Sequence, residues 1–282
     1  MDIDTLVGGF DYWVDEGLFW LNDHAAFVFD TLRVVLDGFY ALVLAAFEYP
    51  PFYVLALVFA LIGWRAVGLR FAILSGLALA FCYAMGLWTE TVATLALVVT
   101  ATLLALAVGL PLGVLAGFNA SLYRVMEPTL DMIQTLPPYI YLLPAIALLG
   151  YGPATALSAT ILVAIPPAVR LTALGIRLTP NEFLELGRAS GVTSWQMFAK
   201  IRLPFAVPSI MAGINQSLML AFGMVVIAGI VGSGGLGEAI YGAIRTLDIA
   251  LSINAAIAIV ILTMVLDRIT QSVGGTPQEA GR

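Results

Sequence analysis

The sequence predicts an all-α membrane protein with several spans, and three observations carry this prediction. Hydrophobic residues make up 61% of the 282-residue chain and charged residues only 11%, whereas soluble domains average roughly 25% charged residues. The apolar residues form stretches of about 20, the length that an α-helix needs to cross a bilayer. The basic residues gather between alternate stretches, as they do in the cytoplasmic loops of membrane proteins.

Seven apolar stretches are long enough to be candidate spans. Several contain Pro or Gly, which membrane helices tolerate where neighbouring helices or a water-filled path satisfy the backbone. Such breaks are equally typical of simple packing kinks. The predicted spans are residues 51–67, 70–88, 91–117, 128–150, 153–175, 205–231 and 248–267.

The distribution of Lys and Arg predicts the orientation of the chain. With the N-terminus outside, ten of the twelve basic residues fall at inside ends and loops, and only Arg33 and Arg245 fall outside. Basic residues are enriched on the cytoplasmic side of membrane proteins. We therefore expect about seven spans running from N-outside to C-inside, with a cytosolic C-terminal tail at residues 271–282.

Residues 1–50 form an acidic tail ahead of the transmembrane region 51–270. The tail carries nine acidic residues and one basic residue, Arg33, and it lacks the basic start of a cleavable signal peptide. Its aromatic and acidic residues at loosely helical spacing indicate one or two amphipathic helices on the outer membrane face. The alternative is an extra span near residues 35–49. The stretch "EYPP" (residues 48–51) marks the junction in either case.

The composition gives little support to catalysis or metal binding by this chain. It holds one cysteine, Cys82, and one histidine, His24, so neither a disulfide framework nor a Cys or His metal cluster is expected. No Ser/His/Asp or Cys/His arrangement stands out, and we expect no catalytic residue and no cofactor in the chain. The stretch "GSGGLG" (residues 232–237) lacks Gly-Lys-Ser/Thr and a preceding strand, so it is not a phosphate loop. We expect it to form a flexible re-entrant turn or a plain linker.

Residues 177–204 are the largest cytosolic feature in this orientation. The stretch "TPNE" predicts a helix with Thr179 at its N-cap, and Gly191 suits the left-handed residue that follows a helix. The stretch "TSWQ" predicts a second capping box at Thr193, and Pro204 is expected to end the second helix and open the next span. The segment is therefore predicted to be a helix, a glycine turn and a second helix.

The same segment holds more large apolar residues than a solvated loop would carry. They predict either a surface for a partner protein or a hairpin that packs on its own bundle. These residues are Phe183, Leu184, Leu186, Trp195 and Phe198.

The segment resembles the cytosolic loop of permease subunits in ATP-binding-cassette importers. That loop has Glu-Ala-Ala, three residues, Gly, nine residues and Ile-x-Leu-Pro. Here Glu185 and Gly191 stand at the matching spacing, while Leu186 and Gly187 replace the two alanines. The resemblance implies a type I importer transmembrane domain whose coupling helix docks into a groove on a separate ATPase. The coupling residues that it implies are Glu185, Gly191, Trp195, Phe198, Ile201, Leu203 and Pro204.

Other stretches, roughly within residues 50–240, resemble the glycine betaine/proline betaine/choline branch of these permeases. Among them are "LDMIQTLPPYIYLLPA", "IPPAVRLTALGIR" and "WRAVGLR". The resemblance implies import of a quaternary ammonium compound, delivered by a binding protein, across a bacterial or archaeal cell (inner) membrane. It also implies a homodimer, with ATP and Mg bound by two ATPase subunits, and no nucleic acid. The alternatives are an ion-gradient transporter or channel, and an importer for another small solute such as an amino acid.

Polar and aromatic residues inside the predicted spans are candidates for lining a path. Quaternary ammonium groups donate no hydrogen bonds and are held by aromatic faces, and polar side chains in lipid require partners. Packing between helices would explain the same residues equally well. The candidates are Gln134, Thr135, Tyr139, Tyr141, Asn215 and Gln216.

Two acidic residues near these candidates have a simpler expected role. Glu127 and Asp131 are four residues apart and share a helix face. Pro128 suggests a helix N-terminus at the cytosolic interface, where the helix dipole favours acidic residues. We expect this placement, with Arg124 as a partner, rather than a proton relay.

Overall fold

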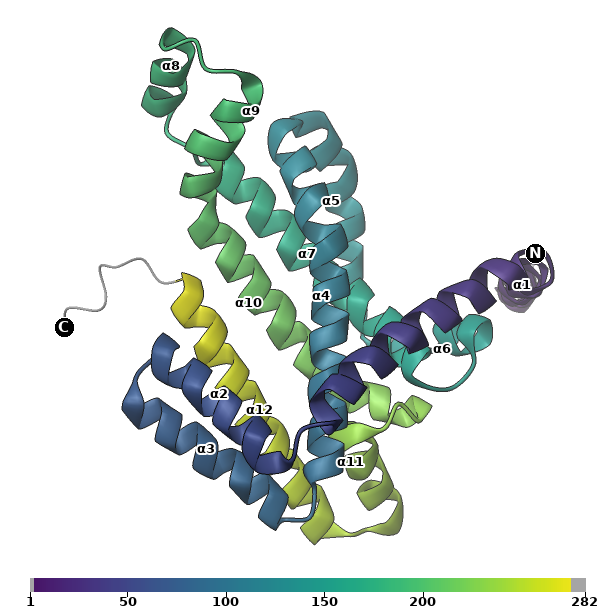
Figure 1. Cartoon of the computed structure of the whole chain (residues 1–282). Helices are drawn as coiled ribbons and strands as arrows, with labels where there is room; N and C mark the ends of the chain where they lie inside the picture. Colours follow the sequence, from purple (N-terminus) through teal and green to yellow (C-terminus); the bar gives the residue numbers. More distant parts are fainter. Residues whose placement is uncertain (1–2, 275–282) are drawn as a thin grey trace.

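The computed structural model describes residues 3–274, and the elements in this range are all helical (Figure 1). The predicted all-α fold is confirmed. The tail predicted at 271–282 lies mostly outside the described residues. The helices are α1 (Ile3–Glu48), α2 (Phe52–Ala66), α3 (Leu69–Ala84), α4 (Trp88–Phe118), α5 (Ala120–Thr135), α6 (Tyr139–Leu149), α7 (Pro153–Arg177), α8 (Asn181–Ala189), α9 (Ser194–Gln196), η1 (Met197–Arg202, a π-helix), α10 (Leu203–Ala228), η2 (Gly229–Val231, a 3₁₀-helix), α11 (Gly235–Thr246) and α12 (Ile249–Gly274).

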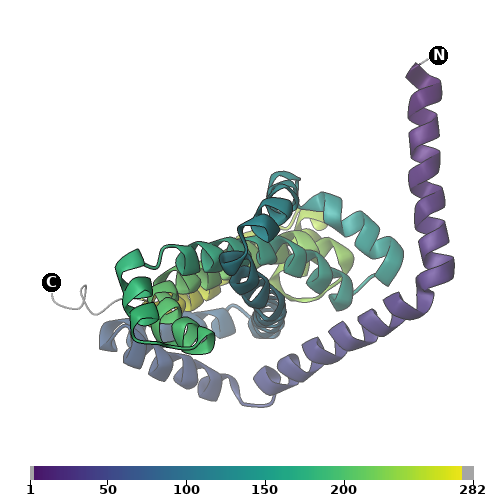
Figure 2. The same cartoon turned by 90° about the horizontal axis from the view of Figure 1, so that it is seen from above.

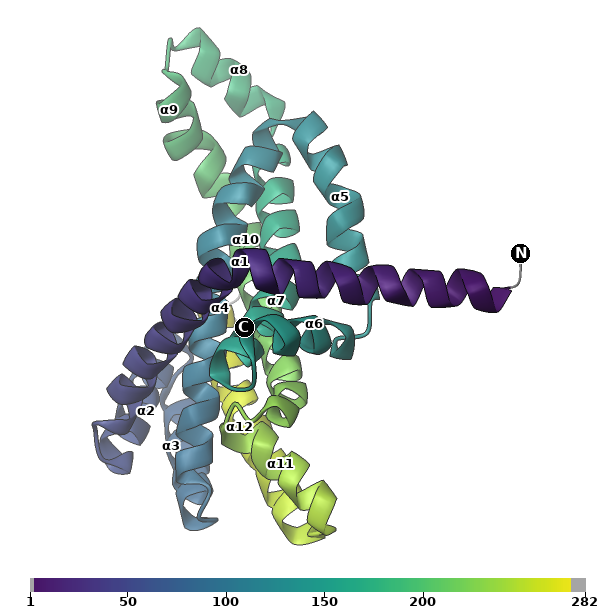
Figure 3. The ribbon, with the colours of Figure 1, turned by 90° about the vertical axis from the view of Figure 1, so that its right-hand side faces the viewer.

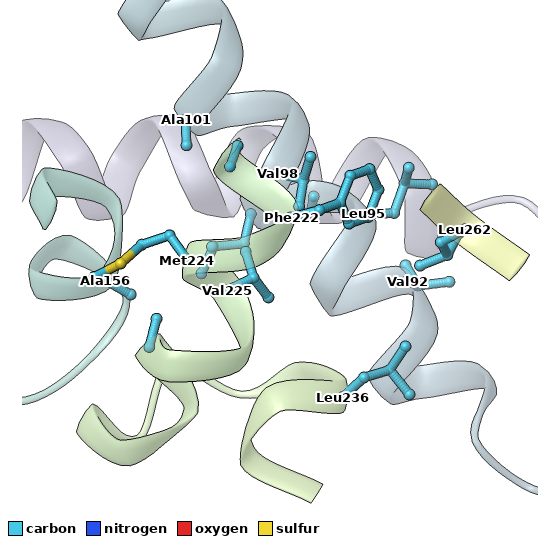
Figure 4. Close-up of a cluster of buried hydrophobic side chains, with 14 of the residues drawn as sticks. Val92, Leu95, Val98, Ala101, Ala156, Phe222, Met224, Val225, Leu236 and Leu262 are labelled. Atoms are coloured by element: carbon cyan, nitrogen blue, oxygen red, sulfur yellow. The ribbon is translucent and has the colours of Figure 1, made fainter. Parts of the chain in front are cut away.

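The centre of the fold is formed by three long helices, α4, α7 and α10, which pack on one another. Side chains from α4, α10, α11 and α12 meet in one apolar cluster (Figure 4). Leu95, Met224 and Leu262 are among its largest buried members, each at most 2% exposed. The central helices thus form a buried framework on which the more exposed segments are mounted.

Small residues allow α4 to approach α7 closely. Gly109, Gly113 and Gly117 recur at every fourth position of α4. A Cβ on Gly113 would lie 2.6 Å from the Cβ of Thr172 and 2.8 Å from the carbonyl oxygen of Val169. Small residues at this spacing are how membrane helices bring their backbones together. The contact between α4 and α7 therefore leaves no room for a side chain at Gly113.

The glycine-rich stretch 232–237 forms a short turn at residues 232–234 and then the first turn of α11, so it is not a plain linker, while the flexible re-entrant turn stays a prediction. Its Leu236 is fully buried, and the Leu236 N–H donates a 2.7 Å hydrogen bond to Thr94 Oγ1 on α4. A Cβ on Gly229 would lie 2.2 Å from the carbonyl carbon of Gly237. Gly229 and Gly237 are required because two backbones come into contact, which spacing along the sequence does not reveal.

The helices α2 and α3 form a short hairpin beside α12 (Figure 1). A Cβ on Gly63 would lie 2.9 Å from ring carbons of Phe71, so the two helices meet closely there. At the other end of the hairpin, Phe52 stacks on Tyr83 with ring centroids 3.9 Å apart, and Trp88 meets both rings edge-on. Tyr and Trp are enriched at membrane–water interfaces, so this aromatic group fits the outer end of the bundle.

The predicted acidic tail is a single long helix, α1, which is bent and extends away from the other helices (Figures 2 and 3). It ends at Glu48, and α2 begins at Phe52 after a 95° bend, so the "EYPP" junction is confirmed. The C-terminal part of α1 packs on α4, α6 and α7. There the Asp37 carboxylate accepts a 2.9 Å hydrogen bond from the backbone N–H of Ala154. Asp37 therefore caps the N-terminus of α7 from another helix.

Replacing Asp37 with Ala is expected to lower the free energy of unfolding by about 1 kcal/mol, the usual effect of losing an N-terminal helix cap. Asp37→Asn keeps an acceptor oxygen and should be nearly neutral. Thermal melting of the purified protein in detergent measures the change. The exposed Asp30 on the same helix supplies the matched control, Asp30→Ala. Equal melting temperatures for Asp37→Ala and the control would show that the hydrogen bond contributes nothing.

The number of spans predicted from the sequence, seven, is not confirmed. Four helical stretches are long and apolar enough to cross a membrane alone, and up to six spans result if each of two bent helix pairs counts as one. The described helix α2 has 15 residues, which is about 22 Å at the α-helical rise of 1.5 Å, short of the ~30 Å hydrocarbon core. The predicted span 128–150 is in fact α5 and α6, which meet at 98°.

The break between α5 and α6 follows from two consecutive prolines. Pro137 disfavours helical backbone at the residue before it, and Leu136 is extended, with ψ at 139°. The helix α5 begins at Ala120, where the Asn119 side chain accepts hydrogen bonds from the N–H groups of Ser121 and Leu122. Pro128 lies inside α5, so the predicted helix start at Pro128 is wrong.

Candidate functional site

The segment between α7 and α10 forms the far end of the molecule, beyond the ends of α4 and α5 (Figures 1 and 3). It consists of α8, a turn at Gly191, and α9 continued by η1. The predicted helix, glycine turn and helix are therefore present. We call residues 178–202 the helical hairpin.

The turn of the helical hairpin is held by hydrogen bonds on both sides. Gly191 has a φ of +69°. Its N–H donates to the carbonyl of Arg188, and the N–H of Val192 donates to the carbonyl of Gly187. This pair of bonds is the Schellman motif that ends helices at a left-handed glycine. The second capping box is also present, because Thr193 and Gln196 exchange hydrogen bonds of 2.9 and 3.3 Å.

The first predicted capping box is wrong. Helix α8 begins at Asn181, and its N-cap residue Pro180 makes no side-chain cap. The Thr179 hydroxyl donates instead to the carbonyl of Ile176, at 3.1 Å. That carbonyl belongs to the last turn of α7, which needs donors for its free carbonyls. Thr179 therefore satisfies the end of the preceding helix rather than the start of the next.

The predicted helix end at Pro204 is also wrong. The chain stays helical from Ser194 to Val231, with Pro204 in the first turn of α10. Immediately before it, η1 is a π-helix, and the N–H of Leu203 donates to the carbonyl of Phe198 five residues earlier. A proline removes an α-helical hydrogen bond, and the wider π turn accommodates that loss without ending the helix.

Gly187 and Leu186 replace the two alanines of the related loops, and they face opposite ways in the helical hairpin. Gly187 is buried against η1, where a Cβ would lie 2.7 Å from Cδ1 of Ile201 and 2.8 Å from Cε of Met197. Leu186 points away from this contact and is 63% exposed. Gly187 thus lies against the mobile ends of two side chains of η1, and Leu186 adds apolar surface to the outside.

The predicted coupling residues divide into exposed and packed groups. Glu185 is exposed and Trp195 is 72% exposed. Phe198 packs between Trp195 and Phe118 at the end of α4, with ring centroids 5.6 and 5.7 Å apart. Ile201, Leu203 and Pro204 lie on η1 and the start of α10.

Cationic side chains tie the helical hairpin to the bundle. The guanidinium of Arg202 lies over the Phe118 ring at 4.9 Å. At the end of α7, Arg177 donates to the carbonyl of Ala116 on α4 at 2.6 Å and lies 4.3 Å from the centre of the Tyr123 ring on α5. Arg202 thus connects η1 of the hairpin to α4, and Arg177 connects the end of α7, where the hairpin begins, to α4 and α5.

The structure places the predicted path-lining residues in two separate groups. The first surrounds the bend between α5 and α6, where Gln134, Thr135 and Tyr139 are exposed. The Tyr141 hydroxyl donates to the carbonyl of Ile133 at 2.8 Å, across the bend. This hydrogen bond holds the two helices at their angle, so Tyr141 has a structural contact as well as a position near the candidate path.

The second group lies between α10 and α12. Asn215 Oδ1 accepts a 2.7 Å hydrogen bond from Thr270. Asn215 and Gln216 line a polar hollow of about 360 Å³ together with Thr270 and Gln271. The two groups are on different helices, and the structure does not bring them together within one chain.

An ion pair between α5 and α7 is the feature that sequence reasoning missed. Arg170 donates to the carboxylate of Asp131. Arg124, the expected partner of the α5 acids, is instead bonded to Ser121 Oγ and to the carbonyl of Ala120. The signal for a longer α5 was Asn119, a favoured N-cap residue. Spacing along the chain held no signal for the pairing with Arg170, 39 residues away.

Among the side chains that the structure describes, no group of three or more from His, Cys, Asp and Glu is placed to hold a metal ion. The arrangement offers a rigid exposed hairpin and polar groups within an apolar bundle.

Comparison with known proteins identifies the family. The family model described as "binding-protein-dependent transport system inner membrane component" matches residues 109–274, more than half of the chain. The chain belongs to this family. The permease is therefore an inner-membrane component of an ATP-binding-cassette importer, which works with an ATP-binding subunit and a binding protein.

Relatives of the permease include named transport proteins. The glycine betaine/proline betaine transport system permease protein ProW of Escherichia coli is 40% identical over 275 residues, which covers 96% of this chain and 77% of the relative. The glycine betaine transport system permease protein OpuAB of Bacillus subtilis is 36% identical and covers 92% of each chain. A chain from inward-facing structures of the MetNI methionine importer has a TM-score of 0.58 at 25% identity, covering 66% of this chain and 95% of that chain. The type I importer fold is therefore confirmed.

Proposed function

We infer that the permease imports a quaternary ammonium compound such as glycine betaine or choline, delivered by a binding protein. The similarity to permeases named for glycine betaine, over at least 92% of this chain in three cases, is the observation that carries the proposal. In this proposal two copies of the chain form the path between them, as a two-fold symmetric dimer, the commonest arrangement of homo-oligomers.

The helical hairpin is the proposed docking element for the ATP-binding subunit. Its outward surface carries the carboxylate of Glu185 and the apolar side chains of Leu186 and Trp195, and exposed aromatic groups of this kind are typical anchors at protein interfaces. Phe198 and Ile201 lie on the inner side of the hairpin. There Ile201 packs against Gly187 of α8, and Phe198 packs against Phe118 of α4. Gly191 keeps the turn between them rigid.

Transport follows from a switch between two arrangements of the bundle. Two partner ATPase subunits bind ATP and Mg and close on each other, which moves the two hairpins together. Because Arg202 ties each hairpin to α4, and Arg177 ties the adjoining end of α7 to α4 and α5, this motion opens the path on one side and closes it on the other. The energy comes from the different affinities of the partner for the two states.

Reconstitution tests this proposal. The permease, copurified with the ATPase and binding protein encoded beside it, is placed in vesicles, and uptake of radiolabelled glycine betaine and choline is measured with and without ATP. We expect ATP-dependent uptake that requires all the components. Uptake by the permease alone, indifferent to ATP, would refute the proposal in favour of an ion-gradient transporter.

A second candidate substrate is an amino acid, because the structural neighbours belong to a methionine importer. Radiolabelled methionine in the same vesicles tests it. Uptake of methionine without uptake of either amine would show that the substrate is an amino acid. The proposed coupling mechanism would be unaffected.

A further inference from the structure

A polar stripe runs along the outward surface of α5. Four positions of one helix face, Arg124, Glu127, Asp131 and Gln134, are all exposed. At 100° per residue they fall within an arc of about 80°. Charged side chains that face lipid are costly, and inside membrane proteins they face a water-filled cavity or another chain. The stripe therefore marks the side of α5 that lies against a polar environment.

The ion pair of Asp131 with Arg170 connects this stripe to the central helix α7. The two side chains remain accessible, at 57% and 28% of their surface respectively. The Nε atom of Arg170 is buried and has no hydrogen-bond partner among the described residues. That buried Nε is out of reach of a ligand, but the guanidinium has further N–H donors and the side chain is partly exposed. These donors, beside a carboxylate with spare acceptor positions, can bind a further charged group.

The pair lies part-way along α7 rather than at its end. Arg170 precedes Arg177, at the cytosolic end of α7, by seven residues, which is about 10 Å along the helix. Asp131 lies five residues before the bend at Leu136, and about one helical turn before the predicted path residue Gln134. Both charges therefore stand in the inner half of the candidate path, at the point where α5 ends.

The geometry points to the Asp131–Arg170 pair as a charge-complementary checkpoint for a zwitterion that carries a quaternary ammonium group and a carboxylate. This assignment rests on the proposed function and names the residues that its substrate would meet. The ammonium end of the zwitterion lies against Asp131, and its carboxylate receives hydrogen bonds from Arg170 as the pair opens. Once the zwitterion has passed, the two side chains pair again and close the path to small ions.

Opposite charges on one small molecule suit this arrangement. A zwitterion replaces each partner of the pair at the same time, so neither charge is left without an opposite charge beside it. A cation without a carboxylate replaces only one partner and leaves Arg170 unpaired. A guanidinium holds a carboxylate with two parallel hydrogen bonds, so Arg170 is the group that distinguishes the two classes of substrate.

The experiment uses the complete complex with its ATPase and binding protein in vesicles, with glycine betaine and choline as probes. We expect Arg170→Gln and Asp131→Asn each to lower the rate of glycine betaine uptake at least tenfold. Uptake of choline by Arg170→Gln should fall by less than threefold relative to wild type. The exposed Arg65 at the end of α2 gives the matched control, Arg65→Gln, which should retain wild-type uptake.

The double variant Asp131→Asn/Arg170→Gln separates this role from a merely structural one. Asn and Gln can still bond to each other, so a pair that only holds α5 against α7 would be restored, and uptake would return. The checkpoint predicts continued loss of glycine betaine uptake, with an unchanged melting temperature and basal ATP hydrolysis. Recovery of uptake in the double variant would overturn the assignment. If the wild-type complex transports neither probe, the proposed substrate class itself is wrong.

Discussion

Gly191→Pro is expected to abolish ATP-dependent uptake while the protein still inserts into the membrane. Gly191 has a φ of +69° and donates its N–H to the carbonyl of Arg188. Proline fixes φ near −65° and has no N–H, so the turn cannot form and α8 loses its orientation relative to α9. We expect uptake in vesicles to fall at least about tenfold, since a loss of 1.4 kcal/mol in coupling already has that effect.

The matched variant is Gly191→Asn. Asn is the residue that most readily replaces Gly at a left-handed helix end, so this variant should keep more than a third of wild-type uptake. Membrane insertion and the amount of purified permease should be equal for the two variants. Full activity of Gly191→Pro would show that the rigid turn has no part in coupling.

Gly229→Ala is expected to have the largest effect on stability. A Cβ at this position would lie 2.2 Å from the carbonyl carbon of Gly237 and 2.5 Å from the nitrogen of Glu238. These are backbone atoms, so no side chain can rotate away to make room. Overpacking of this kind costs about 1–3 kcal/mol and sometimes more. We expect a loss of about 3 kcal/mol in the free energy of unfolding, measured by chemical denaturation in detergent.

Gly223 provides the control on α10. No atom lies within 4 Å of a Cβ built there, and Ala is favoured over Gly in a helix by about 1 kcal/mol. Gly223→Ala should therefore be neutral or stabilising. If the two variants unfold at the same denaturant concentration, then the backbone contact between η2 and α11 is looser than the structure describes.

The local features of the helical hairpin could be predicted from the sequence, because each depends on residues a few positions apart. The capping box at Thr193 and the glycine turn at Gly191 are such features. Two predictions failed at the ends of the hairpin, where it joins α7 and α10. Thr179 bonds to the end of α7, and a π turn lets the helix continue through Pro204. Neither arrangement can be recognised from the short sequence motif alone.

The path residues stay a prediction, because polarity within a span does not say what the side chain faces. Asn215 was a candidate for the path, yet its side chain is bonded to Thr270 on α12. Asp131 was expected at a helix start, yet it lies near the end of α5 and pairs with Arg170. The helix start depended on Asn119, while the pairing depended on how α5 packs against α7.

By itself, the sequence determined that this chain is a bundle of apolar helices with a basic, capped hairpin at one end, because composition, periodicity and caps act over one or two helical turns. The tertiary structure decided which residues meet across helices. Asp37 caps α7, Gly229 contacts Gly237, and Arg170 holds Asp131. Each of these contacts joins residues whose relative position is set by the packing of whole helices, and the apolar surfaces that drive this packing are too alike to specify it by pattern alone.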